Sequence, residues 1–228
     1  MTTEIEFKLP EGRIRGAVRR LLCAGYTGRS RAAVEAHIAE LAPLGIGPPP
    51  HVPMLFPIIP GLLSQSTETS VLGTHTAPEV EYVIVRLDGS DYVTVGSDQT
   101  DSVMEGKHPP TAKNLCLKSV AAEAWPMADV ADHWDLLELK LICNGKLMQE
   151  GSLSSILTPE QLRAFVAEHD GPDDEGRMIF SGTLETHGRF PESEMSIDIS
   201  LSDPVLDRAI RHSYRVTPMA ELFPAHSA

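Results

Sequence analysis

Hydrophobic and polar positions alternate most clearly in the middle of the chain. Residues 82–87 (YVIVRL) and 92–95 (YVTV) carry the period-two pattern that is typical of β-strands. The segment DGSD between them supplies a turn, and Gly89-Ser90 is the predicted two-residue loop. The pattern therefore predicts a β-hairpin within residues 78–101, and the rest of the chain is interpreted around it.

Acidic residues lie at the open end of this hairpin. With that loop, Glu81 lies opposite Asp98, and Glu79, two residues before Glu81, is on the same face. Directly opposed side chains have Cβ atoms roughly 5 Å apart, so like charges there are destabilising. A divalent cation would remove the conflict, and oxygen-only ligands favour Mg²⁺, Mn²⁺ or Ca²⁺. The alternative is a solvated strand end on an acidic protein.

Weaker patterns predict the remaining elements. Upstream, they predict strands at residues 3–8, 17–26 and 67–72, a helix from Ser30 or Arg31 to about Ala42, and an extended proline-rich crossing segment at 48–63. Downstream, they predict a loop with one helical turn at 102–111, extended chain at 113–120, a helical turn at 128–133, a hairpin of 136–143 and 146–149 around Asn144-Gly145, a helix at 159–169 capped by Thr158, and strands at 178–183 and 195–201. The tail from residue 215 is weakly patterned.

Many strands with two substantial helices indicate an α+β protein, mainly β, with an antiparallel or mixed sheet and few β-α-β units. Hydrophobic residues within the proline-rich segment indicate that it is packed, so no domain boundary is placed there. The expected organisation is a single domain over residues 1–228. Residues 1–65 would form an N-terminal strand, helix and crossing segment, and residues 66–205 a β core that carries the chemistry.

Composition narrows the class of partner. The net charge of −13 argues against binding to nucleic acid or to an anionic membrane surface. No hydrophobic run approaches the roughly 18 residues of a membrane span, and the first residues do not resemble a signal peptide. Three widely spaced cysteines fit a reducing cytoplasm, and the lack of CxxC and HExxH motifs argues against zinc. A cytoplasmic protein is expected.

The motifs from about residue 25 to residue 201, taken in order, resemble the fumarylacetoacetate hydrolase family. That family has an ExE pair on a strand followed by an Asp, similar to EVE at residues 79–81 and GSDQTD at residues 96–101. Its helical His and Glu are similar to HIAEL, its lysine segment to AKNL, its second hairpin to NGKLMQEG, and its GT substrate loop to SGT at residues 181–183. GYTGR, HIAEL, EVE, GSDQTD and HWD together look like an uncharacterised bacterial branch of that superfamily.

The resemblance implies a mixed β-sheet roll, a homodimer and a divalent cation, Mg²⁺ or Mn²⁺ and less typically Ca²⁺, that holds a 1,3-dicarbonyl or acylpyruvate-type 2-oxo acid. Hydrolysis would break a C–C bond through a metal-bound enolate, and the implied roles fall on four groups of residues. These are the metal ligands Glu79, Glu81 and Asp98, the proton acceptor His37 oriented by Glu40, an oxyanion-stabilising lysine that is Lys113 first and Lys118 second, and the substrate-binding pair Gly182 and Thr183.

Departures from the family pattern keep other functions open. Ser102 stands where the family has an arginine, and Glu123-Ala124 stands where it has Gly-Pro before the tryptophan. The same site could serve a decarboxylase, hydratase or tautomerase, or a non-catalytic protein that binds a small molecule. A non-haem iron enzyme that uses His75 with Glu79 or Glu81 is a further alternative. His133 is interpreted as structural, and Cys116 has no neighbouring base in the sequence.

Overall fold

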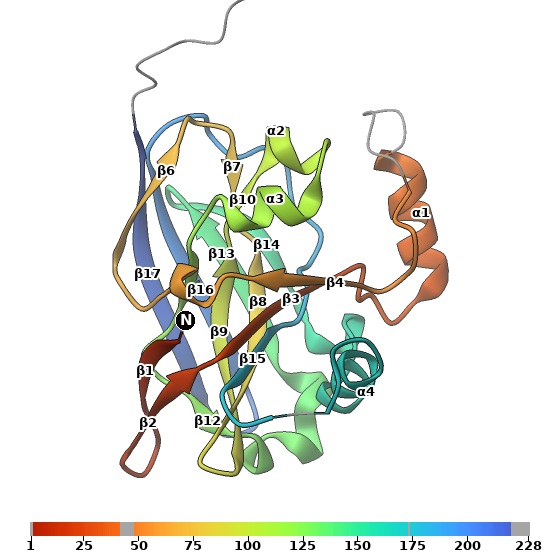
Figure 1. Ribbon diagram of the computed structural model, residues 1–228. Coiled ribbons are helices and arrows are strands. Elements are labelled where there is room, and N and C mark those ends of the chain that lie inside the picture. The colour runs from red at the N-terminus through yellow and green to blue at the C-terminus, as the bar shows by residue number, and fades with distance from the viewer. Residues whose placement is uncertain (1, 42–47, 173, 220–228) are drawn as a thin grey trace, which may run out of the picture.

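The computed structural model describes residues 2–41, 48–172 and 174–219, and the side chains of residues 33, 36, 37, 40 and 41 are outside that description. Two curled sheets dominate it (Figure 1). The larger sheet has the order β4 (Met54–Ile58), β3 (Arg20–Gly25), β15 (Arg177–Phe180), β8 (Val80–Leu87), β9 (Ser90–Asp98), β11 (Lys118–Val120) and β5 (Leu63–Ser64), with β12 (Trp125–Pro126) also paired to β9. The second has the order β14 (Lys146–Ser152), β13 (Glu138–Cys143), β16 (Met195–Asp203), β17 (Arg208–Met219) and β6 (Glu68–Leu72).

Smaller elements complete the described chain. Two short sheets pair β1 (Thr3–Lys8) with β2 (Arg13–Val18) and β7 (Thr76–Ala77) with β10 (Thr100–Asp101). The α-helices are α1 (Arg31–Leu41), α2 (Ser102–Glu105), α3 (Pro109–Asn114) and α4 (Pro159–Asp170). Most strand pairs are antiparallel, but β3 with β15, β5 with β11 and β6 with β17 are parallel. The mixed, mainly β architecture confirms the predicted fold class. Every described helix is too short or too polar to cross a lipid bilayer.

The β8–β9 hairpin is buried on both faces because each face packs on its own hydrophobic core. One core includes Tyr82 and Ile84 and is closed by the second sheet. The other includes Val83 and Val85 and is closed by residues of β1, β2 and β4. Burial on both faces leaves β8 almost entirely buried although its side chains alternate in direction.

The turn of this hairpin differs from the prediction. Leu87 pairs with Ser90, so the two-residue loop is Asp88-Gly89 and not Gly89-Ser90. Asp88 has φ 50° and Gly89 has φ 70°. Two consecutive positive φ angles define a type I′ turn, for which Asp-Gly is a favoured pair. The register therefore moves by two residues, which leaves every side chain on its predicted face.

Other predictions were confirmed or corrected. The helices at Arg31–Leu41 and Pro159–Asp170 were predicted, and Thr158 forms a capping box with Gln161. The Asn144-Gly145 hairpin was also predicted, and residues 17–26 proved to be two strands that meet near Arg19. The extended segment predicted for residues 113–120 was wrong at its start, because α3 continues to Asn114. The strand content of the segment from residue 215 was underestimated, because β17 runs for 12 residues to Met219.

Candidate metal centre

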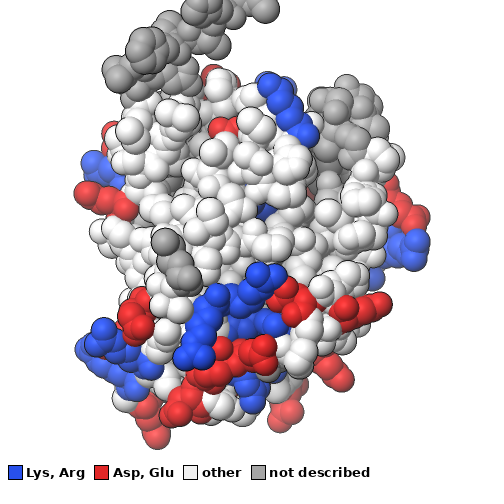
Figure 2. Space-filling model, in the orientation of Figure 1, with Lys and Arg blue, Asp and Glu red and all other residues white. Residues whose placement is uncertain are grey.

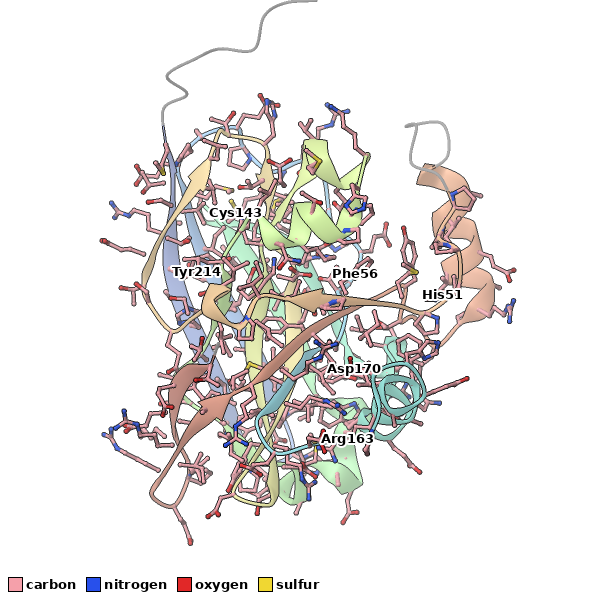
Figure 3. All side chains as sticks on the ribbon, in the orientation of Figure 1. His51, Phe56, Cys143, Arg163, Asp170 and Tyr214 are labelled. Atoms are coloured by element: carbon pink, nitrogen blue, oxygen red, sulfur yellow. The ribbon has the colours of Figure 1, made fainter. Side chains whose placement is uncertain are left out.

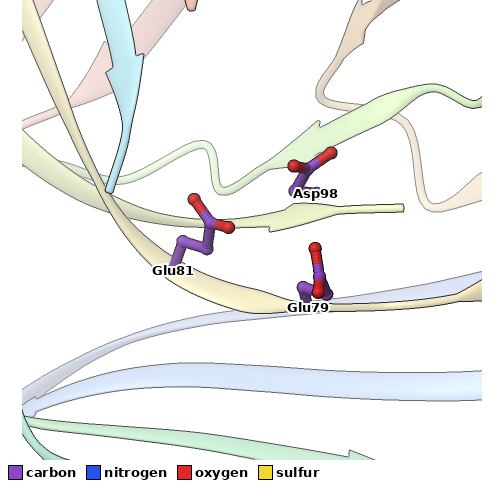
Figure 4. A group of neighbouring side chains, drawn as sticks. All are labelled: Glu79, Glu81 and Asp98. Atoms are coloured by element: carbon purple, nitrogen blue, oxygen red, sulfur yellow. The ribbon is translucent and has the colours of Figure 1, made fainter. Parts of the chain in front are cut away.

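Three carboxylates converge at the open end of the β8–β9 hairpin (Figure 4). Glu79 directly precedes β8, Glu81 is its second residue, and Asp98 ends β9. The backbone N–H of Asp98 donates to the carbonyl of Glu79 at 2.9 Å, so Glu79 rather than Glu81 is its cross-strand neighbour. Each of the three residues offers a carboxylate oxygen, and these oxygens lie within 4.8 Å of one another. The sequence therefore predicted the convergence but not the pairing.

Two lysines hold Asp98 from different elements. Lys113 of α3 donates to Asp98 Oδ2 at 2.6 Å and to Glu79 Oε2 at 3.1 Å. Lys118 of β11, directly opposite Asp98 in the sheet, lies 2.7 Å from Asp98 Oδ1 and donates to the carbonyl of Gln99 at 2.6 Å. Both predicted lysines thus face the same carboxylate, each bound to a different oxygen.

Glu81 is held by the backbone of a loop that follows β15. The N–H of Gly182 donates to Glu81 Oε2 at 2.8 Å. Gly182 has φ 90°, and a Cβ atom there would lie 2.2 Å from Thr27 Oγ1, so glycine is required both by conformation and by space. Thr27 Oγ1 in turn donates to the carbonyl of Ser181 at 2.6 Å. The predicted substrate residue Gly182 therefore orients a carboxylate through its backbone.

The Thr183 hydroxyl is engaged within the protein. It donates to the carbonyl of Val80 at 2.8 Å and accepts from the side-chain amide of Gln149 at 3.0 Å. Val80 lies between Glu79 and Glu81. The Thr183 side chain thus braces the acidic strand.

The pKa values in this group diverge because burial and the neighbouring charges act differently on each residue. Burial opposes ionisation of Asp98, but the ammonium groups of Lys113 and Lys118 outweigh it and lower the Asp98 pKa to about 2. Burial raises the pKa of Glu81 well above its usual range, and the charges of Asp98 and Glu79 add to that rise. Burial lowers the pKa of Lys113, but Asp98 and Glu79 reverse this and hold it well above its usual range.

A fourth carboxylate, which the sequence analysis did not single out, lies near this group. Glu105 is on α2, and burial raises its pKa to about 7, with the charge of Glu79 as the next largest cause. Its position seven residues after Asp98, in a segment predicted as a loop with one helical turn, gave no signal of chemistry.

Access to the carboxylates is asymmetric. The Asp98 side chain is 0% exposed, whereas that of Glu79 is 23% exposed. Lys113 Nζ also lies 5.6 Å from the centroid of the Phe56 ring on β4 (Figure 3). Figure 2 shows a largely uncharged face over α2, α3 and β4, with a few basic atoms recessed at its centre. Glu79 is therefore more accessible to a ligand than Asp98.

The remaining predicted residues lie elsewhere or outside the description. His37 and Glu40 are on the backbone of α1, but their side chains are outside the described residues. His75 Nδ1 lies 3.6 Å from Glu192 Oε1 and does not join the three acids. His133 Nε2 lies 3.0 Å from Asp203 Oδ1. Burial raises the pKa of Cys116 to about 11, which disfavours a thiolate nucleophile near neutral pH.

The donor set fits a hard divalent cation. All three groups offer only oxygen, and three carboxylates against two ammonium groups leave an excess of negative charge in a buried place. No histidine or cysteine joins them among the described side chains, which disfavours zinc and the predicted non-haem iron alternative. Glu79, Glu81 and Asp98 are therefore the residues that could hold Mg²⁺, Mn²⁺ or Ca²⁺.

Comparisons with solved structures place this arrangement in a known fold. A protein from Burkholderia cenocepacia described as a "putative fumarylpyruvate hydrolase" matches with a TM-score of 0.68 at 16% identity, over 96% of this chain and 97% of that one. One from Oleispira antarctica described as a "putative fumarylacetoacetate isomerase/hydrolase" matches with a TM-score of 0.68 at 21% identity, over 93% of this chain and 99% of that one. A 2-keto-3-deoxy-D-arabinonate dehydratase complexed with magnesium and 2,5-dioxopentanoate matches with a TM-score of 0.62 at 16% identity, over 89% and 74%.

Sequence comparison gives the family itself. No curated protein sequence matches the chain. The family model described as protein of unknown function DUF2848 matches residues 24–214, which include all three acids and both lysines. The chain therefore belongs to the DUF2848 family and has the fold of the fumarylacetoacetate hydrolase family proteins.

Proposed function

We propose that this chain is a divalent-metal-dependent enzyme that hydrolyses a C–C bond in a 1,3-dicarbonyl or acylpyruvate-type 2-oxo acid. The observation that carries the proposal is the convergence of Glu79, Glu81 and Asp98, whose ligand oxygens lie within 4.8 Å of one another. Two proteins that share the fold are described as a "putative fumarylpyruvate hydrolase" and a "putative fumarylacetoacetate isomerase/hydrolase", and these descriptions support this class of substrate.

When bound, a divalent cation supplies Lewis-acid polarisation of a carbonyl oxygen and a counter-charge for negative charge that develops there. The two lysines then have different tasks. The raised pKa of Lys113 keeps its amine protonated, so it can donate to a substrate oxygen but cannot act as a base. Lys118 is 0% exposed and holds Asp98 in place without reaching a ligand.

Proton transfer is assigned to His37, with Glu40 orienting its imidazole on α1. As water adds to the carbonyl carbon, one of its protons moves to His37. The C–C bond then breaks, its electron pair stays on the departing carbon, and that carbon takes up a proton. The products are a carboxylic acid and a 2-oxo acid or ketone.

Dehydration of a 2-oxo acid is the second candidate. A dehydratase with the same fold holds magnesium together with 2,5-dioxopentanoate. Dehydration would use the same three acids and Lys113 but would lose water without breaking the carbon skeleton. Product analysis separates the two candidates, because hydrolysis yields two carbon fragments and dehydration yields one.

A substrate panel with matched variants tests the proposal. Acylpyruvates, oxaloacetate and simple 2-oxo acids would be assayed with Mg²⁺ or Mn²⁺, using the wild type, Glu81→Ala and the control Glu138→Ala on the exposed start of β13. Glu81→Ala should lower kcat/KM by roughly 100-fold or more, since even outer partners of metal ligands contribute 10–100-fold. Turnover that survives both a chelator and Glu81→Ala would reject the proposal.

A further inference from the structure

Gln149 reaches the acidic strand from the second sheet. It lies on β14, is 0% exposed, and its side-chain amide is engaged at both ends. Its Oε1 accepts from the N–H of Val80 at 2.9 Å. Its Nε2 donates to the carbonyl of Leu184 at 2.8 Å, and to the hydroxyls of Thr183 and Thr186 at 3.0 Å each. One side chain therefore ties the strand between Glu79 and Glu81 to the loop after β15.

These bonds replace a missing piece of β-ladder. β15 pairs with β8 only as far as Phe180, which lies opposite Val83, and Ser181 then donates its N–H to the carbonyl of Tyr82. Val80, two residues further along β8, has no strand on that side, and a buried unpaired backbone group is costly. Gln149 satisfies its N–H, and the Thr183 hydroxyl satisfies its carbonyl at 2.8 Å.

Two parts of the backbone position Glu81, and both depend on the side-chain amide of Gln149. The first is the backbone at Val80, which precedes Glu81 directly. The second is the Gly182 N–H that donates to Glu81 Oε2 at 2.8 Å, in a loop whose next residues are bound by Gln149. A shift of the amide would move the carboxylate and its donor together.

We propose that Gln149 is a positioning residue of the candidate metal centre, holding Glu81 and the Gly182 N–H in register from the opposite sheet. It is not a catalytic residue, since both ends of its amide are bound to other protein groups. The inference rests on the proposed function only where it predicts that substitution of Gln149 weakens metal binding. The predicted effect of that substitution on the Gly182 backbone concerns the metal-free protein.

The test compares Gln149→Glu with Gln161→Glu. The first keeps an acceptor for Val80 but replaces the two amide N–H donors by at most one O–H, so the bonds to Leu184, Thr183 and Thr186 cannot all be kept. The second adds the same charge at the start of α4, where Glu can replace Gln in the capping box with Thr158. Gln149→Asn is a milder uncharged variant whose amide is one methylene too short to reach both segments, and it serves if Gln149→Glu does not fold.

Two measurements are made on each variant. Backbone amide exchange of Gly182, followed by NMR in the metal-free protein, should accelerate about five- to tenfold in the Gln149 variants, the change that corresponds to one hydrogen bond. The dissociation constant for Mn²⁺, followed by EPR of the free ion, should rise about 10- to 100-fold. Gln161→Glu should leave both unchanged.

The outcomes separate this inference from the proposed function. If Gly182 exchange and Mn²⁺ affinity in the Gln149 variants equal those of the wild type, the positioning role is rejected while the metal centre stands. If the wild type does not bind Mn²⁺, the proposed function fails, and Gly182 exchange alone decides the role of Gln149. A general loss of stability, with all core amides accelerating equally and Mn²⁺ affinity retained, would also overturn the inference.

Discussion

Lys118 Nζ lies 2.7 Å from Asp98 Oδ1, and both side chains are 0% exposed. The pair is therefore desolvated, and each charge depends on the other. Removing Lys118 would leave the buried Asp98 with Lys113 as its remaining ammonium partner and Oδ1 without its ion pair. The contact holds Asp98, one of the three carboxylates of the candidate metal centre.

Lys118→Met should destabilise the protein by about 3–5 kcal/mol, the usual cost of breaking a buried ion pair. Urea unfolding at neutral pH would measure the difference. Lys8→Met is the control, because Lys8 pairs with Glu123 at an exposed site where an ion pair contributes little. Equal unfolding free energies for the two variants would contradict the prediction.

The loss of folding stability at low pH should depend on Asp98. Its pKa is lowered from 3.8 to about 2 in the folded state, so its contribution is full above the unfolded value and is lost as pH falls through about 2. The shift corresponds to about 2 kcal/mol. Unfolding followed between pH 5 and pH 1.5 should show this loss in the wild type and not in Asp98→Asn, whose baseline stability is expected to be lower throughout.

Glu81→Gln should stabilise the metal-free protein. Burial raises the pKa of Glu81 well above its usual range, so the folded state gains stability as pH falls from that raised pKa toward the ordinary value. The glutamine removes both the buried charge and this pH dependence. Thermal unfolding in a chelator at pH 8 would show a higher Tm for Glu81→Gln than for the wild type.

Added Mn²⁺ should reverse that order. At 100 times its dissociation constant, a ligand that binds only the folded state adds about 2.7 kcal/mol. The wild type should gain this stability and Glu81→Gln should not. A stabilisation by Mn²⁺ of equal size in both proteins would mean that the ion binds elsewhere.

Gly182→Ala should cost more stability than Gly12→Ala. The two glycines have φ values of 90° and 88°, so the conformational strain of a side chain is matched. A Cβ at Gly182 would lie 2.2 Å from Thr27 Oγ1, whereas nothing lies within 4 Å of one at Gly12. The difference in unfolding free energy should be about 1–3 kcal/mol, the cost of overpacking, and Gly182→Ala alone should weaken Mn²⁺ binding.

Glu105 should titrate near neutral pH in the metal-free protein. Burial and the charge of Glu79 raise its pKa from 4.5 to about 7. Carboxyl ¹³C NMR would detect the transition, and Glu105→Gln would assign it. Because a cation at Glu79 offsets part of that charge, Mg²⁺ should move the transition to lower pH. A midpoint near 4.5 without metal would contradict the raised pKa and the influence of Glu79 on Glu105.

The acidic group was predictable because side-chain direction has a period of two. Placing the turn at Gly89-Ser90 instead of Asp88-Gly89 moved the register by two residues, so Glu79, Glu81 and Asp98 still shared a face. The error changed which acid pairs with Asp98. A one-residue error would have placed Asp98 on the opposite face.

Lys113 and Gln149 were harder to place because their roles depend on contacts between elements. Nothing in the pattern around Lys113 distinguished extended chain from the short helix α3, yet only the helix brings its amine to Asp98 and Glu79. Gln149 appeared only within a hairpin motif, since a glutamine in a strand carries no signal of a partner on another sheet. The homodimer, the single domain and the roles of His37 and Glu40 stay predictions.

The Asp88-Gly89 tip has a consequence for how sequences in this family can vary. Glu79 lies nine positions before Asp88 and Asp98 lies nine positions after Gly89, so the two acids are equally far from the turn. If one residue were added to each strand of the hairpin, or one were removed from each, the hairpin would become longer or shorter and the acids would still face each other. An odd insertion in one arm would turn the acids of that arm to the opposite face, so unpaired length variation should be absent from the arms and concentrated in loops outside the hairpin.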